Sequence, residues 1–205
     1  MAEGLREIKR RATRRAMEKA AVDLAYDEGV GAVTVDRVCA TALVSRSTFF
    51  NYFDSLDEAI FGSALDYDPV LTERILTRHP HDLVVAASLI VIESVRGEPE
   101  DTVTQRRLAL FVREPGLTTA VSWSSHDSRE RLVTVIKTWL DAHPELARLP
   151  DAEHETEARL TVALSIALGD EVQRHAREVD GEVYFDPETF RSAHRRIAAI
   201  SVPAE

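Results

Sequence analysis

A short run of polar side chains near residue 50 offers the most distinctive chemistry in this chain. Arg46, Ser47, Thr48, Asn51 and Tyr52 can donate hydrogen bonds to phosphate oxygens or to base edges. An asparagine has adenine as its natural partner for a two-hydrogen-bond contact. Short polar groups and one arginine at the start of a helix suit the reading of DNA in the major groove.

The residues around this run predict two short helices joined by a tight turn, between Thr34 and Phe53. Thr34 can cap the first helix and Ser45 the second, because each can accept a hydrogen bond from a free backbone amide. Apolar residues at helical spacing give each helix a face for a core. They are Val35, Val38, Cys39 and Ala42 in the first helix, and Phe49, Phe50 and Phe53 in the second. The pattern is that of a helix-turn-helix.

The stretch from about Arg10 to Ile60 resembles the DNA-binding domain of the TetR family of transcriptional regulators. The resemblance rests on residues in register across four elements, namely Ala16, Ala20, Ala21, Leu24, Glu28-Gly29, Thr34-Val35, Val44-Ser45, Thr48, Phe53 and Asp54-Ser55. It implies that Thr34, Arg46, Thr48 and Tyr52 touch DNA. We add Ser45, Ser47 and Asn51 to the expected contacts. A purely structural helical hairpin is the alternative reading, since such hairpins occur in many proteins without a DNA role.

Three residues depart from the family pattern. Leu43 occupies the turn position where glycine is usual, and a left-handed backbone there would cost a non-glycine residue about 1–2 kcal/mol. Phe50 stands where a phosphate-touching tyrosine is common. Leu56 stands where a lysine often meets the DNA backbone. Two expected phosphate contacts are therefore missing.

The charge distribution favours DNA contact only at the N-terminal end. The whole chain carries a net charge of −10 over 205 residues, which disfavours nucleic acid. Residues 1–53 hold 9 basic and 7 acidic side chains, a balance of +2, whereas residues 54–205 hold 16 and 28, a balance of −12. A basic cluster near the N-terminus consists of Arg6, Lys9, Arg10, Arg11, Arg14 and Arg15. It can neutralise phosphates, and Arg10 and Arg14 are the expected contacts. A solvated terminus is the alternative, and the position beside the helix-turn-helix favours DNA.

Beyond Phe53 the positions of capping residues and prolines predict helices throughout, so we expect an all-α fold. The expected organisation is an N-terminal three-helix DNA-binding domain over residues 1–54 and a larger helical domain over residues 55–205, with about nine helices in total. After the helix that starts near Ser55 and is interrupted at Asp68-Pro69, the expected helices cover Asp82–Val95, Glu100–Arg113, Leu117–Ala142, Ala152–Val179 and Pro187–Val202. The longest apolar run, Leu83–Ile92, is too short to span a membrane. A cytoplasmic protein is expected.

The last two helices predict a homodimer. Each carries an apolar stripe, and the small alanines of the first permit close approach. The expected interface residues are Leu160, Ala163, Leu164, Ala167 and Leu168 of the first stripe, and Phe190, His194, Ile197 and Ala198 of the second. The resemblance implies that these helices pair across a two-fold axis, and the operator would then be a near-palindrome. Packing of both stripes inside one subunit is the alternative.

The resemblance also implies a cavity in the second domain for a small-molecule effector that competes with DNA. The candidate lining residues are Leu89, Ile92, Arg107, Phe111, Trp123, Trp139 and Ser165. A plain core role is the alternative for each, except that the charge of Arg107 would need a partner if buried. Similarity from Gly4-Leu5-Arg6 to Phe49–Phe53 points to a subgroup with acyl-CoA-like effectors, but it covers only the DNA-binding half.

No residue pattern predicts catalysis, a metal or a cofactor. Ser124, His126 and Asp127 are the types of a nucleophilic triad, but near neighbours along a helix cannot converge on one atom. His154 and Glu157 could share a helical face, and two ligands make a poor metal site. The single cysteine, Cys39, lies on an apolar helix face, as buried structural thiols do.

Together these observations predict a sequence-specific DNA-binding regulator and not an enzyme. We expect a repressor that a small hydrophobic or amphipathic ligand releases from its operator. The alternative is a helical protein-interaction adaptor that has lost specific DNA binding, which Leu43, Phe50, Leu56 and the acidic second domain would suit.

Overall fold

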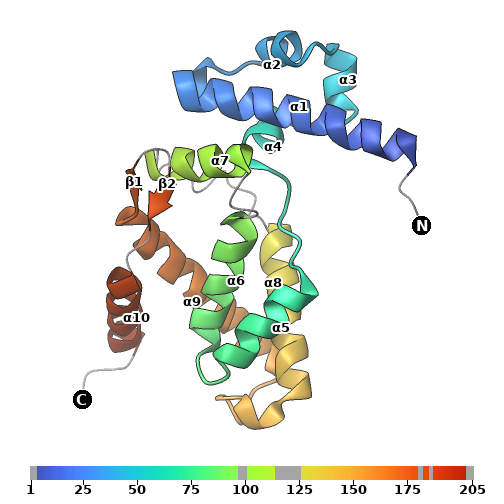
Figure 1. Ribbon diagram of the computed structural model, residues 1–205. Helices are drawn as coiled ribbons and strands as arrows, with labels where there is room; N and C mark the ends of the chain where they lie inside the picture. The colour runs from blue at the N-terminus through green and yellow to red at the C-terminus, as the bar shows by residue number, and fades with distance from the viewer. Residues whose placement is uncertain (1–3, 97–100, 114–125, 180–181, 185–186, 202–205) are drawn as a thin grey trace.

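The computed structural model describes residues 4–96, 101–113, 126–179, 182–184 and 187–201. The all-α class is confirmed, and the described residues form ten α-helices (Figure 1). Their bounds are α1 Leu5–Glu28, α2 Val35–Ala42, α3 Arg46–Phe50, α4 Leu56–Phe61, α5 Pro69–Arg78, α6 Leu83–Arg96, α7 Thr102–Arg113, α8 His126–Ala142, α9 His154–Arg174 and α10 Pro187–Ser201. Short 3₁₀ turns cover Val30–Ala32 and Pro144–Leu146. None of the described helices is long and apolar enough to cross a membrane.

Helices α2, α3 and α4 begin at side-chain caps, as the sequence predicts for each. The hydroxyl oxygen of Thr34 accepts a hydrogen bond from the amide of Arg37 at 3.3 Å. Ser45 and Ser55 do the same for the amides three residues on, at 3.0 and 3.1 Å. Each cap satisfies an amide that a helix start leaves without a partner. The caps therefore divide this part of the chain into short helices.

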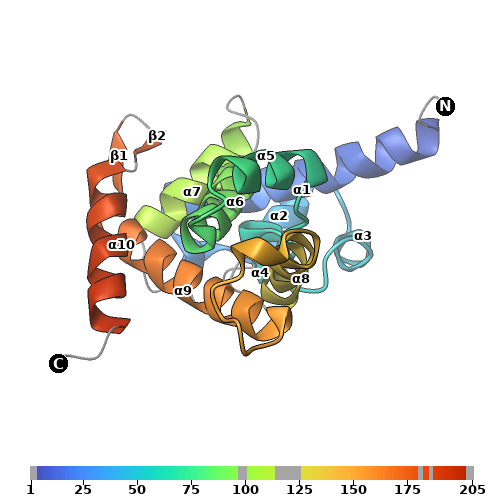
Figure 2. The same ribbon diagram turned by 90° about the horizontal axis from the view of Figure 1, so that it is seen from below.

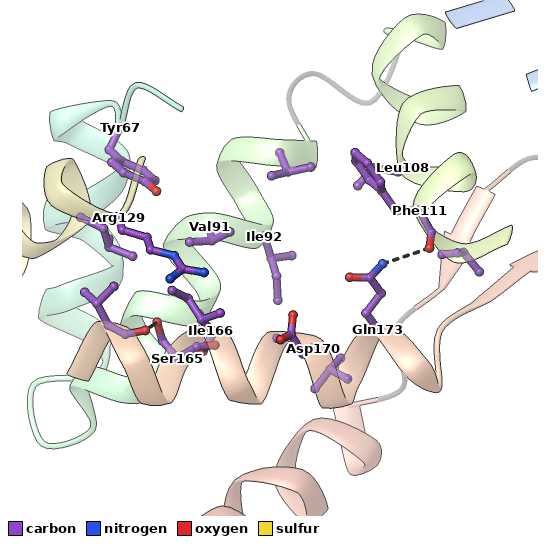
Figure 3. Close-up of a pocket in the computed structure, with 17 residues that line it drawn as sticks. Tyr67, Val91, Ile92, Leu108, Phe111, Arg129, Ser165, Ile166, Asp170 and Gln173 are labelled. Atoms are coloured by element: carbon purple, nitrogen blue, oxygen red, sulfur yellow. Dashed lines mark hydrogen bonds between the residues drawn. The ribbon is translucent and has the colours of Figure 1, made fainter. Parts of the chain in front are cut away.

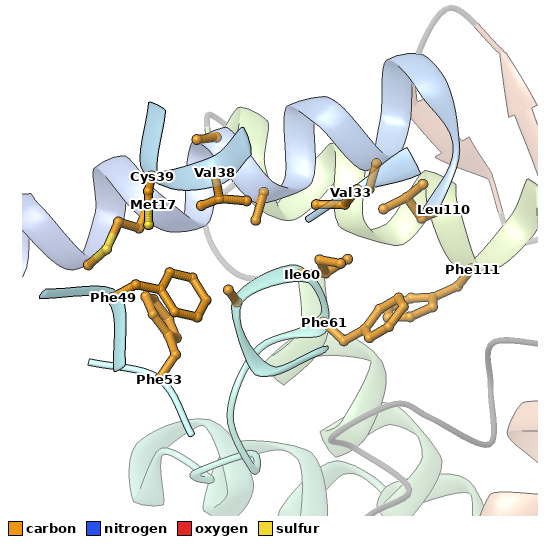
Figure 4. Close-up of a cluster of buried hydrophobic side chains, with 14 residues drawn as sticks. Met17, Val33, Val38, Cys39, Phe49, Phe53, Ile60, Phe61, Leu110 and Phe111 are labelled. Carbon is orange, nitrogen blue, oxygen red and sulfur yellow. The ribbon is translucent and has the colours of Figure 1, made fainter. Parts of the chain in front are cut away.

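The first hydrophobic core lies between α1 and these short helices (Figure 4). Met17 of α1 packs with Phe49 and Phe53, and none of the three is more than 1% exposed. Leu110 and Phe111 of α7 belong to the same core. The predicted domain boundary after residue 54 therefore stays a prediction, because a helix from far along the chain completes this core.

A second core lies among α5, α6, α8 and α9. Ile90 of α6, Ile136 and Leu140 of α8 and Ala158 of α9 are fully buried within it. Helix α6 is surrounded by α5, α8 and α9 in both views, as its almost wholly apolar sequence predicts (Figures 1 and 2). Helix α7 lies between the two cores and runs beneath α1 in Figure 1.

Several element boundaries differ from those expected. The helix expected over Ala152–Val179 ends at Arg174 and is followed by a two-stranded antiparallel hairpin, β1 (Arg177–Val179) and β2 (Glu182–Tyr184). The sequence between the strands is Asp-Gly, the pair preferred in two-residue hairpin turns, and it was the signal available for this hairpin. Helix α8 is described from His126, so the expected helical segment 117–125 lies outside the described residues.

Ionic and hydrogen-bonded contacts attach the hairpin to α1 and α7. The guanidinium of Arg113 donates to both carboxylate oxygens of Glu178, at 2.7 and 2.8 Å. The hydroxyl of Tyr26 donates to the same carboxylate at 2.8 Å, and the Arg113 guanidinium lies 3.9 Å from the centre of the Tyr26 ring. These hydrogen bonds, from Arg113 first, lower the pKa of Glu178.

The hairpin contacts predict a pH-dependent contribution to stability. Because the folded pKa of Glu178 is lowered, its contribution is present above the unfolded value of about 4.3 and is lost as the pH falls through the folded pKa. We expect Glu178→Gln to reduce the free energy of unfolding at pH 7 by about 1–2 kcal/mol. Denaturant titrations of both proteins between pH 3 and pH 7 should show this difference shrinking toward acid. Glu73→Gln, at an exposed position of α5, is the control, and an equal loss at every pH would contradict the assignment.

Candidate functional site

The turn between α2 and α3 has the strained geometry expected where the family usually has glycine. Leu43 has φ 56° and ψ 44°, in the left-handed region, and is the only described non-glycine residue with a positive φ. Its side chain is 91% exposed. The exposed leucine thus gains little packing energy to offset a backbone cost of about 1–2 kcal/mol.

The start of α3 presents a small hydrogen-bonded polar surface. The Ser45 hydroxyl lies 2.8 Å from the hydroxyls of both Ser47 and Thr48, in addition to its capping bond. Phe49 is fully buried and fixes the helix against α1. Thr34, Ser45 and Ser47 are exposed, and Thr48 is half-buried. These hydroxyls therefore face outward from a rigidly held helix.

Arg46 is exposed on α3 and held by a carboxylate of the preceding helix. Its guanidinium donates to Asp36 at 2.8 Å, with both side chains more than half exposed. The exposed ring of Phe50 lies one turn further along α3, 6.0 Å from the guanidinium. Asp36 was not among the expected site residues, because its contact with Arg46 depends on how the two helices cross.

Two expected DNA contacts lie beyond the end of α3. The helix stops at Phe50, whereas the sequence suggested that it continues to Phe53. Asn51 is the C-terminal cap residue and is exposed, and Tyr52 lies in the following turn with its side chain half-buried against the first core. Leu56, the third departure, also packs partly against that core.

The side chain of Arg14 is engaged in contacts within the chain. Its guanidinium donates to the carbonyl of Tyr52 at 2.8 Å, to Glu58 at 3.0 Å and to Glu18 at 3.1 Å. It also lies 4.5 Å from the centre of the Phe53 ring. These contacts tie α1 to the end of the helix-turn-helix, and the expected DNA contact of Arg14 stays a prediction. Arg10 is exposed on α1, as are Arg6 and Lys9.

A cavity of about 60 Å³ lies between α6, α7, α8 and α9 (Figure 3). Its walls are mostly apolar, with a few polar groups. The lining residues are Tyr67, Ser88, Val91, Ile92, Val95, Leu108, Phe111, Val112, Arg129, Leu132, Val162, Ser165, Ile166, Gly169, Asp170, Val172 and Gln173. An apolar cavity with a few placed polar groups is the usual form of a small-molecule site.

Three of the seven expected lining residues, Ile92, Phe111 and Ser165, line this cavity. Leu89, Arg107 and Trp139 do not, and Trp123 lies outside the described residues. The indole of Trp139 stacks on His143, with ring centres 4.0 Å apart. Helical spacing alone does not tell which side of a fully enclosed helix faces a void, so these residues were misplaced.

Arg107 instead joins α7 to α4. Its Nε donates to the carbonyl of Ile60 at 2.7 Å. Burial lowers the pKa of this guanidinium, and one of its nitrogens, Nη2, has no hydrogen-bond partner among the described residues. The partner that the buried charge of Arg107 was expected to need is therefore the backbone carbonyl of Ile60.

Five polar lining residues were missed by the sequence analysis, namely Tyr67, Ser88, Arg129, Asp170 and Gln173. Burial raises the pKa of Tyr67 to about 12, which keeps its hydroxyl protonated. Burial also raises the pKa of Asp170, against the opposing effects of Arg174 and Arg129. Asp170 and Gln173 are three residues apart on α9, which places them on one face. That spacing was the signal available in the sequence.

The expected dimer residues divide into two groups. Leu160 and Leu164 are 52% and 36% exposed, and Ala163, Ala167 and Ala198 are exposed as well. Leu168 is fully buried inside the subunit, with Phe190 and Ile197 of α10 packed against it. His194 lies 3.6 Å from Asp82 of the same chain. Leu168 therefore has no surface for a partner, because α10 covers that side of α9.

The remaining candidates have structural surroundings. His154 pairs with Asp141 at 2.9 Å, whereas the buried Glu157 accepts hydrogen bonds from the amides of Arg148 and Leu149, so His154 and Glu157 do not share a ligand. No group of three or more potential metal ligands occurs within the described part of the chain. Burial raises the pKa of the Cys39 thiol, which disfavours the reactive thiolate.

The family model of bacterial regulatory proteins of the tetR family matches residues 19–58. This range holds the capped α2, the left-handed turn and the outward-facing start of α3. Residues 19–58 are a TetR-family DNA-binding domain. The members of this family are bacterial regulatory proteins.

Two solved structures are similar to this chain over most of its length. FadR from Thermus thermophilus, described as a TetR-family transcriptional repressor in complex with lauroyl-CoA, is 18% identical, with a TM-score of 0.47 over 94% of this chain and 96% of that one. GusR from Salmonella enterica is 16% identical, with a TM-score of 0.44 over 92% and 95%. No curated protein sequence matches the chain.

Proposed function

We propose that this chain is a dimeric transcriptional repressor that binds a near-palindromic operator in the cytoplasm and leaves it when a small hydrophobic or amphipathic molecule fills the cavity. The observation that carries the proposal is the position of Phe111. It lines the cavity, and it also belongs to the core of the DNA-binding domain. One side chain therefore takes part in both the effector site and the packing of the helix-turn-helix.

The contacts of α7 supply a physical route between the two sites. The Phe111 ring stacks on Phe61 of α4, with centres 5.8 Å apart (Figure 4). The carbonyl of Phe111 accepts a hydrogen bond from Gln173 of α9 at 3.0 Å. Arg107 adds its bond from α7 to the carbonyl of Ile60. A ligand that displaces Phe111 would move α4, and α4 follows the recognition helix by a short turn.

The proposed reading surface consists of Arg46, Ser47 and Thr48, with Asn51 at the helix end. Arg46 can donate two parallel hydrogen bonds to guanine, and Asp36 already holds its guanidinium outward. The exposed Phe50 ring is suited to contact a thymine methyl group. Arg6, Lys9 and Arg10 are proposed to bind phosphates. Repression, rather than activation, is inferred from the family resemblance.

The proposal predicts selective, salt-sensitive binding to a specific duplex. Selection from a random DNA pool at near-physiological salt should enrich a near-palindrome, and affinity should fall steeply as salt rises. Arg46→Ala should weaken binding to the selected duplex by about 1–3 kcal/mol, as fluorescence anisotropy would measure. Arg78→Ala, at an exposed position of α5, is the control. Absence of any enriched sequence would favour the protein-interaction adaptor instead.

The exposed stripe of α9 predicts the dimer interface. We expect the double substitution Leu160→Arg and Leu164→Arg to give a monomer, because two charges would be buried without partners. Sedimentation equilibrium measures the change in mass. Val70→Arg places the same charge on an exposed apolar residue of α5 and should leave the dimer intact. A double variant that remains dimeric would place the interface elsewhere.

The role of Phe111 predicts a variant that binds both partners but no longer couples them. Phe111→Leu keeps an apolar wall in the cavity but loses the ring stack on Phe61. With a compound identified by thermal-shift screening, the wild type should show a coupling free energy of about 1–3 kcal/mol between compound and operator, and the variant much less. Operator titrations with and without the compound measure it. Phe190→Leu, on α10, is the control, and unchanged coupling in Phe111→Leu would contradict the proposed route.

A further inference from the structure

The buried hydroxyl groups that line the cavity already donate hydrogen bonds to backbone carbonyls. The hydroxyl of Ser88 donates to the carbonyl of Val84 at 2.9 Å, and that of Ser165 donates to Val162 at 2.8 Å. The Tyr67 hydroxyl donates to Ser128 at 3.3 Å. Oxygen lone pairs are what these groups still offer to a ligand.

Gln173 adds an acceptor that has no partner among the described residues. The residue is 6% exposed, and its Nε2 donates to the carbonyl of Phe111 at 3.0 Å. This bond fixes the amide orientation, because a carbonyl can accept only from the nitrogen side. The buried Oε1 has no hydrogen-bond partner within the described part of the chain. Figure 3 shows the oxygen turned away from Phe111, toward the side of the cavity where Ile92 and Asp170 lie.

A buried acceptor without a partner is costly, and water is a poor remedy at this position. The cost of such a group is about 1–3 kcal/mol. A buried water normally makes about three hydrogen bonds. Ile92, Val172 and Phe111 of the cavity lining are apolar, whereas Asp170, three residues before Gln173 on α9, is polar. A ligand that brings both a donor and an apolar surface fits the site better.

The charged groups of the cavity favour an uncharged ligand. Asp170 stands on the same face of α9 as Gln173, and Arg129 approaches from α8 (Figure 3). Among the described residues no ion pair joins them, so both charges can act on a bound molecule. Asp170 repels and Arg129 attracts a ligand anion, and the reverse holds for a cation, so the pair gives a charged ligand of either sign no clear advantage. A neutral polar group meets neither repulsion.

We propose that the effector is an uncharged, largely apolar molecule whose amide N–H or hydroxyl donates a hydrogen bond to Oε1 of Gln173. This inference rests on the proposed function, since it names the ligand class of the same cavity. Ile92, Val172 and Phe111 contact the apolar part. Because Gln173 also holds the carbonyl of Phe111, a ligand bound there lies beside the residue that joins the cavity to α4.

Four matched eight-carbon probes test the proposal by isothermal titration calorimetry on the full chain. Octanamide has the donor and no charge, whereas N,N-dimethyloctanamide keeps the carbonyl and lacks the N–H. Octanoate and octylammonium carry opposite charges. We expect octanamide to bind about tenfold more tightly than each of the others, the ratio for one satisfied hydrogen bond. Equal affinities, tighter binding of a charged probe, or no binding of octanamide would overturn the proposal.

A substitution tests whether Gln173 is the group that accepts the hydrogen bond from the ligand. In Gln173→Leu, octanamide and N,N-dimethyloctanamide should both still bind, with about equal affinities. Gln105→Leu makes the same change on α7, away from the cavity lining, and should keep the preference. A preference that survives in Gln173→Leu would overturn the assignment. If that variant does not fold, the probe series on the wild type still decides the proposal.

The two proposals fail in different ways. Selective octanamide binding without any change in operator affinity would support the ligand class and contradict the coupling. Operator binding that is salt-sensitive and specific, together with no selectivity among the probes, would support the regulator and overturn the ligand class.

Discussion

The packing of α7 against α1 and α4 is the interaction on which the rest of this structure depends. Leu110 and Phe111 close the core beneath the helix-turn-helix, and Phe111 also forms part of the cavity wall. Close-packed cores do not deform gradually, so in the proposed function a change at one side of Phe111 would shift the packing on the other. Arg107 and the hairpin residue Glu178 hold the same helix at two further points.

The electrostatics of the DNA-binding end reflect a compromise between structure and recognition. Arg14 and Arg37 are engaged with neighbouring residues, and Arg46 is paired with Asp36. Fewer cations are therefore available for phosphates than the composition suggests. The exposed pair of Arg46 and Asp36 contributes little stability, because solvent screens both charges. In the proposed function, its effect is to hold the guanidinium in position for a base edge.

Local patterns were sufficient for the parts of the fold that short-range physics controls. The caps at Thr34, Ser45 and Ser55 and the buried Phe49 and Phe53 follow from hydrogen bonding and spacing within a few residues, whereas the left-handed turn at Leu43 was suggested only by the family resemblance. The hairpin after α9 was missed because its strands are three residues long and are held mainly by Arg113 and Tyr26, which are distant in sequence. The contacts of Arg14 were missed for the same reason, since its partners Tyr52 and Glu58 come from later parts of the chain.

The all-α class, the two capped helices and the polar start of α3 could be predicted from the amino-acid sequence, because capping and helical periodicity are local properties. The packing of the helices settles which residues line the cavity, since a helix such as α6 is almost wholly apolar and its pattern indicates no inward face. This packing also decides that Leu168 is internal, because α10 covers it. The unpartnered oxygen of Gln173 emerged in the same way, from the packing of α7 on α9.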